Sequence, residues 1–227
     1  MNIALIGYGK MGHAVEAVAV ERGHQVVCTI DNTDEMDLRL QSLSNADVAI
    51  EFTTPSTAVA NLCRCMDMHV PVVCGTTGWN AEYSDVADYC RRKAGRLFTA
   101  SNFSIGMNIM FALNERLASM MSGRENYSVS LSETHHIHKL DAPSGTALVL
   151  QQAIRKYLPG QDAPIESIRE GEVPGIHIVR YDSEEDTITI AHEAHSRRGL
   201  ALGAVLAAEF LVSQSAGIYT MKDLLAV

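Results

Sequence analysis

Three histidines and a lysine lie within five positions of one another, and a Ser-Gly-Thr step follows them. The stretch reads ETHHIHKLDAPSGTA from Glu133 to Ala147. A histidine side chain can exchange a proton near neutral pH, and a lysine can donate one. The Pro-Ser-Gly-Thr step is typical of a helix N-terminus, whose free backbone N–H groups can bind a carboxylate. The stretch therefore favours a site that holds an anionic substrate beside groups that transfer protons.

The residues of this stretch divide into two sets. Lys139 can donate a proton and His135 or His136 can titrate, whereas Gly145 and Thr146 can hold a carboxylate. That layout suits the reduction of an unsaturated or imine-like acid, in which a hydride reaches one atom and a proton reaches another. A solvated polar loop stays open as an alternative. A metal site is disfavoured, and none is expected, because adjacent histidines on a strand point to opposite faces and no downstream carboxylate or thiol ligand is apparent.

A glycine motif of the type G-x-G-x-x-G follows the first apolar run in NIALIGYGKMG, with its glycines at Gly7, Gly9 and Gly12. The first glycine permits a tight turn, the second lets a pyrophosphate approach the backbone, and the third lets helix and strand pack closely. Asp31 follows about 20 positions later, where an acidic residue binds the adenosine ribose. The motif predicts a dinucleotide site, with a glycine turn that binds nothing as the alternative.

The residues at positions 31 and 32 bear on which dinucleotide is bound. Asp31 can accept hydrogen bonds from a ribose but repels a 2′-phosphate, and its neighbour Asn32 is not an arginine that could compensate. We therefore expect NADH or NADPH as cofactor, with NADH at least as good. Asp31 can also be interpreted as the cap of a following helix.

Two further segments, CGTTGW and TASNFSIG, follow predicted strands at the edge where an open α/β sheet binds ligands. Their small and hydroxyl-bearing residues suit the passage of a nicotinamide ribose and carboxamide, although each segment can also be an ordinary loop. The candidate residues are Gly75, Thr76, Thr77, Ala100, Ser101, Asn102 and Phe103.

Short apolar runs alternate with helix-like segments over the first hundred residues, which predicts βαβ units and a parallel sheet. The runs are residues 3–6, 26–30, 48–52, 70–73 and 97–99, and the first crossover helix is expected over residues 11–22. The sequence pattern then changes. A helix is expected over residues 105–121 and another over 147–158, and apolar and polar residues alternate as in strands in YSVSLSETHH, GIHIVRY and DTITIAHEAH. The segment GLALGAVLAAEFLVSQ predicts a buried helix that packs back on the first domain.

These elements predict an α/β protein: an N-terminal Rossmann dinucleotide-binding domain plus an α+β substrate domain with a mixed open sheet. We expect residues 1–104 and 198–227 to form the dinucleotide-binding domain, and residues 105–197 to form the substrate-binding domain, to which the family resemblance described below adds a role in oligomerisation.

The composition narrows the function classes. The formal net charge of −9 disfavours a general nucleic-acid or membrane-surface role. No apolar run approaches the roughly 20 residues of a membrane helix and no secretory signal is recognisable, so a cytoplasmic protein is expected. The five cysteines form no C-x-x-C pair and are expected to be reduced packing residues.

The chain resembles the 4-hydroxy-tetrahydrodipicolinate reductase (dihydrodipicolinate reductase) family. HHIHKLDAPSGTA is close to the family pattern H-H-x-x-K-x-D-A-P-S-G-T-A, and the resemblance continues in GYGKMG, EFTTPS, CGTTGW, SNFSIGMN, HEAHSRRGLALGAV and GIYTMKDLL. It implies NAD(P)H-dependent reduction of 4-hydroxy-tetrahydrodipicolinate, a small cyclic dicarboxylate, to tetrahydrodipicolinate in lysine and diaminopimelate biosynthesis. It also implies a homotetramer built through the sheet of the second domain, although residues 166–181 form a shorter segment than in longer members.

The resemblance also assigns roles to single residues. His135 is implied as proton donor and acceptor, and Lys139 as proton donor. The implied substrate-binding residues are His136, Gly145, Thr146 and Thr77. The implied cofactor-binding residues are Gly7, Tyr8, Gly9, Lys10, Met11, Gly12, Asp31, Gly75, Thr76, Thr77, Ala100, Ser101, Asn102 and Phe103.

Two other function classes remain as alternatives. One is a different two-domain dehydrogenase acting on an amino or keto acid, because Rossmann domains are shared widely. The other is a regulator that binds NADH without turning it over, although no DNA-binding helix pair or basic arm supports it.

Overall fold

The computed structural model describes residues 1–31 and 39–227. Asn32 and the start of the helix that Asp31 could cap lie outside the described residues. The chain divides into two compact units, one formed by Met1–Ser104 with Arg197–Val227 and the other by Ile105–Ser196. Each unit is described by itself.

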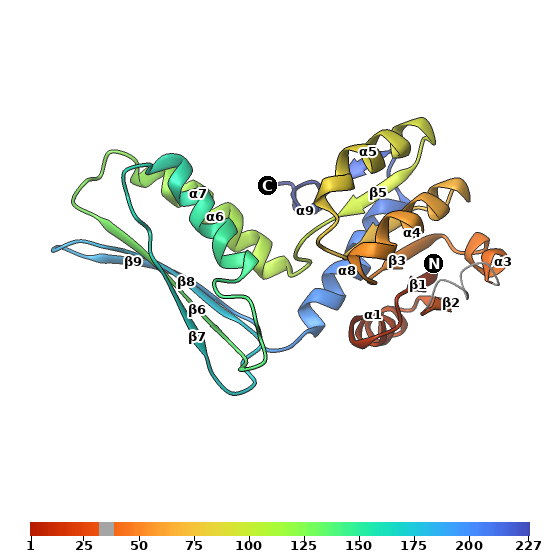
Figure 1. The fold of residues 1–227 in the computed structure, drawn as a ribbon, viewed down its shortest axis with the longest axis horizontal. Helices are drawn as coiled ribbons and strands as arrows, with labels where there is room; N and C mark the ends of the chain where they lie inside the picture. The colour runs from red at the N-terminus through yellow and green to blue at the C-terminus, as the bar shows by residue number, and fades with distance from the viewer. Residues whose placement is uncertain (32–38) are drawn as a thin grey trace. The chain divides into compact units, whose positions relative to one another are not determined.

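The first unit is built on a six-stranded parallel sheet with strand order β10-β5-β4-β3-β1-β2 (Figure 1). Its strands are β1 (Asn2–Ile6), β2 (Gln25–Ile30), β3 (Val48–Glu51), β4 (Val72–Cys74), β5 (Arg96–Thr99) and β10 (Gly217–Tyr219). Its helical segments are α1 (Lys10–Glu21), α3 (Leu40–Ser44), α4 (Pro55–Asp67), η1 (Asn80–Glu82), α5 (Tyr83–Arg92), α8 (Arg198–Val212) and α9 (Met221–Leu225). The β-branched and apolar residues of β1, β3 and β4 are buried, as expected for a parallel sheet covered by helices on both faces.

Helix α8 returns the end of the chain to this sheet, as its all-round apolar sequence predicts. It packs beside α1 and against β3, β4 and β5. A Cβ atom at Gly203 would lie 1.7 Å from the backbone oxygen of Phe103, so only glycine allows this close approach. At the other end of α8, Glu209 accepts bonds from Arg22 and pairs with His24. The N-terminal and C-terminal segments that form this unit are therefore held together by both apolar packing and ion pairs.

The cysteines of this unit are free thiols. Four of them are buried among the apolar side chains of the core, and Cys63 is half-buried. Burial raises the pKa of the Cys65 thiol well above its ordinary value. The thiols of Cys63, Cys74 and Cys90 also have a pKa raised by burial, so these four thiols are protonated and unreactive at neutral pH, in agreement with a packing role.

The second unit is a four-stranded mixed sheet with order β7-β6-β8-β9. Its strands are β6 (Ser128–His135), β7 (Ile165–Arg169), β8 (Ile176–Asp182) and β9 (Thr187–Glu193), and its helices are α6 (Ile105–Met121) and α7 (Gly145–Tyr157). Strands β6 and β7 run parallel, whereas β6, β8 and β9 are antiparallel neighbours. Helices α6 and α7 lie side by side over one face of this sheet (Figure 1). The predicted fold class is confirmed.

The alternation of β6 explains how its last residues come to lie beneath a helix. Val129 and Leu131 point into the core between sheet and helices, and Glu133 and His135 follow on the same face at the next two alternate positions. Glu133 and His135 are therefore buried, although both are ionisable, because they occupy the core-facing positions of the strand.

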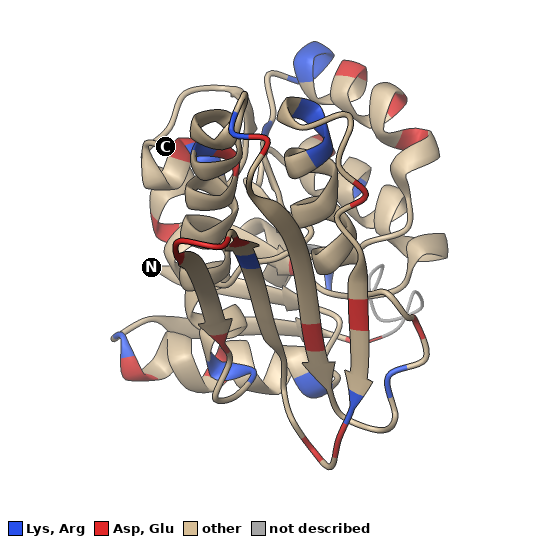
Figure 2. Ribbon diagram, turned by 90° about the vertical axis from the view of Figure 1, so that its left-hand side faces the viewer, with Lys and Arg blue, Asp and Glu red and all other residues tan. Residues whose placement is uncertain are grey.

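Charged residues are spread over the described elements, with Lys and Arg interspersed among Asp and Glu (Figure 2). Among the described helices, none combines the length and the apolar character that crossing a bilayer requires.

Candidate functional site

The glycine loop between β1 and α1 has the geometry of a phosphate-binding turn. Gly7 has φ +91°, and a Cβ atom there would lie 1.9 Å from the backbone oxygen of Phe52. A Cβ at Gly12 would lie 2.4 Å from the backbone oxygen of Gly7. At Gly9, by contrast, a Cβ would meet nothing within 4 Å. Two glycines are thus required by packing and the middle one leaves open space, which fits a pyrophosphate at the start of α1.

Asp31 lies at the end of β2 beside this loop. Its Oδ1 atom accepts a hydrogen bond from the backbone N–H of Tyr8 at 2.9 Å, and its side chain is exposed. Together with Gly7 and Gly9 it lines a hollow of about 420 Å³. A carboxylate at the mouth of a hollow behind the glycine loop fits the adenosine ribose of a dinucleotide.

The loops that follow β3 and β4 meet over the same edge of the sheet. The hydroxyl oxygen of Thr76 accepts a hydrogen bond from the backbone N–H of Thr53 at 2.7 Å. Beneath them, the buried Glu51 carboxylate accepts bonds from the Thr53 hydroxyl and from the Cys74 thiol. A second hollow of about 370 Å³ lies here, lined in part by Gly75, Thr76, Thr77, Lys10 and Met11. The predicted residues of the loop after β4 are therefore brought together with those of the glycine loop.

The loop after β5 carries the remaining predicted cofactor residues. Ala100 and Asn102 are half-buried, and Ser101 is exposed. The Asn102 side chain accepts a hydrogen bond from the backbone N–H of Ser104 at 2.9 Å. Phe103 is 2% exposed and packs against the rings of Phe52 and Phe98. Because its side chain is part of the core, only the backbone of Phe103 can contact a ligand.

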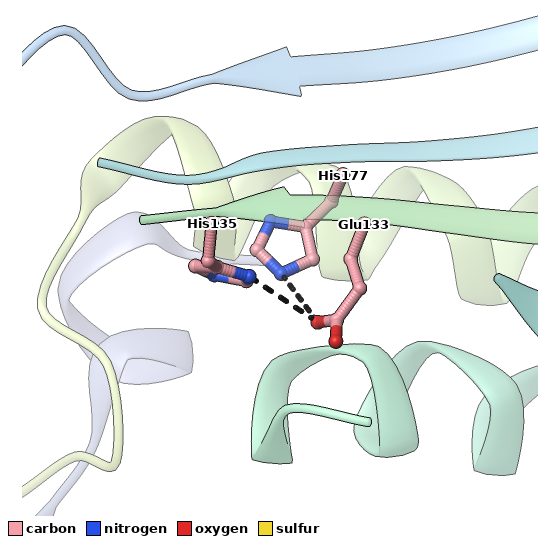
Figure 3. Close-up of side chains that lie close together, drawn as sticks. All are labelled: Glu133, His135 and His177. Atoms are coloured by element: carbon pink, nitrogen blue, oxygen red, sulfur yellow. Dashed lines mark ion pairs between the residues drawn. The ribbon is translucent and has the colours of Figure 1, made fainter. Parts of the chain in front are cut away.

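In the second unit, Glu133, His135 and His177 converge beneath the N-terminus of α7 (Figure 3). All three are buried, with exposed fractions of 1%, 7% and 6%. The Oε2 atom of Glu133 lies 3.5 Å from Nδ1 of His135 and 3.8 Å from Nε2 of His177. Glu133 and His177 are direct partners across β6 and β8. One carboxylate oxygen therefore faces two imidazoles.

The other oxygen of Glu133 is held by three donors. Oε1 accepts hydrogen bonds from the backbone N–H of Ser144 at 3.0 Å and from the hydroxyl of Ser167 at 2.9 Å. The guanidinium of Arg169 approaches the same oxygen at 3.4 Å. Burial by itself would raise the pKa of Glu133, but the bonds from Ser144 and Ser167 outweigh it and the pKa lies below its ordinary value. Glu133 is therefore a buried carboxylate that stays ionised.

The two histidines are held in the neutral form. Burial, and after it the nearby charge of His135, lower the pKa of His177 to about 4. Burial also lowers the pKa of His135, against the opposing effect of the Glu133 carboxylate. At neutral pH both rings are uncharged, and each can therefore accept a proton on one nitrogen.

The Ser-Gly-Thr step begins a helix, as its sequence predicts. Ser144 is the N-cap of α7, and its hydroxyl oxygen accepts a hydrogen bond from the backbone N–H of Ala147 at 3.2 Å. The first bond of the helical ladder is donated by Leu148 to the carbonyl of Ser144. The N–H groups of Gly145 and Thr146 come before it, and a Cβ at Gly145 would meet nothing within 4 Å. These two donors are therefore available to a carboxylate.

Lys139 lies in the loop between β6 and α7. Its ammonium group bonds both carboxylate oxygens of Asp141, at 2.8 and 2.9 Å. Arg169 donates to the backbone oxygens of Lys139 and Asp141 and so fixes the path of the loop. The positive charge of Lys139 lowers the pKa of His135, though less than burial does. The Lys139 ammonium group can exchange Asp141 for a substrate carboxylate as its partner.

The remaining two histidines of the stretch lie apart from the buried cluster. His136 is half-buried and its ring centroid lies 6.0 Å from that of His138. His138 is exposed and pairs with Glu172 at 3.1 Å. The structure thus separates the three histidines, placing only His135 with Glu133 and His177.

The sequence interpretation missed several residues of both units. Glu133, His177 and Arg169 surround His135, and Phe52 and Thr53 line the hollows of the first unit. The signal for Glu133 was present, because it lies two positions before His135 on a predicted strand and so shares its face. The position of His177 depends on strand pairing, which carries no local signal.

The fold and these two groups of residues define a class: proteins that join a Rossmann-type dinucleotide-binding domain to an α+β domain with a buried cluster of titratable side chains. Residues 1–103 match the family described as dihydrodipicolinate reductase, N-terminus, and residues 106–225 match dihydrodipicolinate reductase, C-terminus. The chain belongs to the dihydrodipicolinate reductase family.

Individual relatives agree with this assignment. A 4-hydroxy-tetrahydrodipicolinate reductase of Christiangramia forsetii is 44% identical, covering 100% of this chain and 98% of the relative. The enzyme of the same name from Staphylococcus aureus is 35% identical, covering 99% of this chain and 100% of the relative. A solved structure of a dipicolinate-bound dihydrodipicolinate reductase from Paenisporosarcina sp. TG-14 shares the fold, with a TM-score of 0.80 at 20% identity over 97% of both chains.

The comparisons confirm the family and the enzyme class that the sequence predicts. The chain is an oxidoreductase that catalyses the 4-hydroxy-tetrahydrodipicolinate reductase step of lysine and diaminopimelate biosynthesis. Its first unit is the domain that binds a pyridine dinucleotide.

Proposed function

We propose that this chain reduces 4-hydroxy-tetrahydrodipicolinate to tetrahydrodipicolinate with Lys139 and His135 as its proton-transfer groups. The observation that carries the proposal is the second unit's combination of a buried His135, a lysine in the following loop and the open helix N-terminus at Gly145 and Thr146. Residues 1–104 with 198–227 are proposed as the cofactor domain and residues 105–197 as the substrate domain.

The reaction adds one hydride and one proton to the substrate, and the substrate's hydroxyl group leaves as water. A bound nicotinamide supplies the hydride. Lys139, close to the substrate dianion, donates the one proton that the reaction consumes and is left as an amine that solvent reprotonates. His135, neutral at pH 7, can accept a proton and return it with no net change. Lys139 pairs with Asp141 at 2.8 Å, and a substrate carboxylate can replace Asp141 as its partner.

We assign the substrate carboxylates to the first turn of α7. Gly145 and Thr146 supply backbone N–H groups, and the helix dipole favours a negative charge there. His136 adds a donor from the strand end, and Thr77 of the first unit is proposed as a further substrate contact. A dianion is held at this turn although the whole chain is acidic, because the binding groups are local.

The cofactor-binding residues are proposed as the three loops of the first unit: Gly7, Tyr8, Gly9, Lys10, Met11, Gly12, Asp31, Gly75, Thr76, Thr77, Ala100, Ser101, Asn102 and Phe103. The exposed Asp31 carboxylate at the mouth of the hollow favours a ribose with a free 2′-hydroxyl. NADH is therefore proposed to serve at least as well as NADPH.

A homotetramer assembled through the second unit's sheet is part of the proposal. The face that α6 and α7 leave uncovered presents small and apolar side chains in register, with Ser132, Ile178 and Ala191 aligned across three strands. Ile168 on the neighbouring strand is 38% exposed. Sedimentation at micromolar concentration should give four chains per particle, and a monomer would contradict this part.

Following NADH and NADPH oxidation separately with 4-hydroxy-tetrahydrodipicolinate tests the reaction. The proposal predicts substrate-dependent oxidation of both cofactors, with NADH at least as effective. A parallel panel of 2-keto acids with ammonia distinguishes the alternatives. Oxidation only with the panel would identify a different dehydrogenase. NADH binding without any oxidation would identify a nucleotide sensor.

A further inference from the structure

We infer that Glu133 is a positioning residue that couples His135 to the carboxylate-binding N-terminus of α7. The inference rests on the proposed function, because it assigns a task to a residue behind the proposed proton-transfer group. Glu133 is 1% exposed and therefore acts through the groups it holds.

One oxygen of Glu133 is committed to the start of α7. It accepts the backbone N–H of Ser144, the N-cap of that helix, and also the hydroxyl of Ser167. The hydroxyl of Ser144 in turn accepts the N–H of Ala147. The carboxylate therefore holds the helix start directly, one residue before the donors at Gly145 and Thr146.

The other oxygen of Glu133 is aimed at the histidine pair. It lies 3.5 Å from Nδ1 of His135 and 3.8 Å from Nε2 of His177. Within the described part of the chain, neither this oxygen nor Nδ1 of His135 has a hydrogen-bond partner, although both are buried. A buried donor and acceptor facing each other at this distance need only a small movement to bond, and catalytic hydrogen bonds are often long before the substrate is bound.

This arrangement selects one tautomer of His135. A carboxylate facing Nδ1 favours the proton on that nitrogen, which leaves Nε2 as the nitrogen that exchanges a proton with the substrate. Gly175 leaves room on that side, since a Cβ there would lie 3.2 Å from Nε2 of His135. His177, with its pKa of about 4, stays neutral and does not compete for the carboxylate's charge.

The charged and titratable groups around the pair come from four strands and one loop. Glu133 lies on β6 with His135, and the others are Arg169 on β7, His177 on β8, His192 on β9, and Lys139 and Asp141 in the loop before α7. Lys139 and Arg169 lower the pKa of His135, whereas Glu133 and Asp141 raise it. Among these charges, Glu133 has the largest effect on the pKa of His135, and only burial has a larger one.

Glu133→Gln is the decisive variant, because glutamine keeps the size and an oxygen that can accept the Ser144 N–H but removes the charge. Since the Glu133 carboxylate raises the pKa of His135, its loss should move the pH limit of kcat/KM that His135 sets to lower pH. We expect kcat to fall by at least about tenfold, with the Kd for NADH unchanged. Glu184→Gln, exposed in the turn between β8 and β9, is the matched control and should change neither quantity. An unchanged pH profile and kcat in Glu133→Gln would overturn the inference.

The tautomer can be measured without any reaction. ¹⁵N spectra of histidine-labelled protein should show neutral His135 with its proton on Nδ1 in the wild-type protein, and on Nε2 or mixed in Glu133→Gln. The same Nε2 tautomer in both proteins would overturn the positioning role even if the enzyme is active. Absence of wild-type turnover alongside the expected tautomers would instead reject the proposed reaction.

Glu133, His135 and His177 have potential metal-ligand atoms within 4.8 Å of one another, so a separate experiment tests for a bound metal. Turnover of the wild-type enzyme should persist after treatment with a chelator. Loss of turnover on chelation, restored by Zn²⁺, would make Glu133 a metal ligand and overturn the inference.

Discussion

A Cβ atom at Gly75 would lie 2.0 Å from the ring of Phe52, so the loops after β3 and β4 touch where no side chain fits between them. Phe52 lines both hollows of the dinucleotide-binding domain. The ring of Phe52 is therefore part of the wall of both hollows, and Gly75 is part of the wall of the second.

Gly75→Ala should push the Phe52 ring into the space that it lines. We expect the Kd for NADH to rise about tenfold, equivalent to about 1.4 kcal/mol, and the stability to fall by about 1–3 kcal/mol from overpacking. Fluorescence titration and urea unfolding measure the two effects. Gly199→Ala, where a Cβ would meet nothing within 4 Å, is the control. An unchanged Kd would show that the ring does not shape the cofactor site.

Asp31→Asn should change cofactor preference more than total activity. The amide keeps an oxygen for the Tyr8 N–H but removes the charge that repels a 2′-phosphate. The ratio of kcat/KM for NADPH to that for NADH should rise about tenfold, or about 1.4 kcal/mol. Asp85→Asn, exposed on α5, provides the matched charge change. A constant ratio would remove Asp31 from cofactor selection.

Ser144→Ala should destabilise the start of α7. The variant loses the hydroxyl that accepts the Ala147 N–H but keeps the backbone N–H bonded to Glu133. Loss of such a cap costs about 1 kcal/mol. Urea unfolding of this variant beside Ser122→Ala, at an exposed position after α6, measures the difference. Equal stability of the two variants would show that the cap contributes nothing.

The buried His177 predicts a pH dependence of stability. Its pKa is about 4 in the folded protein against an ordinary 6.5. Between these values the unfolded chain binds more protons, so the free energy of unfolding falls as pH drops from about 6.5 towards 4. The slope from this one group is at most about 1.4 kcal/mol per pH unit.

Unfolding at several pH values between 4 and 7 checks this for wild-type protein and for His177→Asn. The slope should be shallower in the variant, while His69→Asn, at an exposed position, should keep the wild-type slope. Identical slopes in all three proteins would mean that His177 is protonated as easily in the folded state as in the unfolded one.

The sequence predicted best what is local. The glycine loop is a contiguous motif, and the helix expected over 105–121 has those bounds because its apolar spacing is continuous. The crossover helix begins one residue earlier than expected, at Lys10, and the strands β7 and β10 were not anticipated. The roles assigned to single residues by resemblance remain predictions.

What the sequence could not give was register. Glu133 meets His177 because the antiparallel pairing of β6 and β8 sets them opposite each other, and the parallel pairing of β6 and β7 sets His135 opposite Arg169. Pairings between residues so far apart along the chain leave no periodic signal in either strand. The contact of Phe52 with Gly75 is non-local in the same way.

The most direct test of the proposed reaction compares Lys139→Ala with the wild-type enzyme in NADH oxidation by 4-hydroxy-tetrahydrodipicolinate. Lys156→Ala, whose exposed amine pairs with Glu115 on α6, is the control for losing a lysine. The account predicts that kcat of Lys139→Ala falls by about 10²–10⁴-fold, with the Kd for NADH within about twofold of wild type. Unchanged turnover, or an equal loss of turnover and NADH affinity, would contradict it.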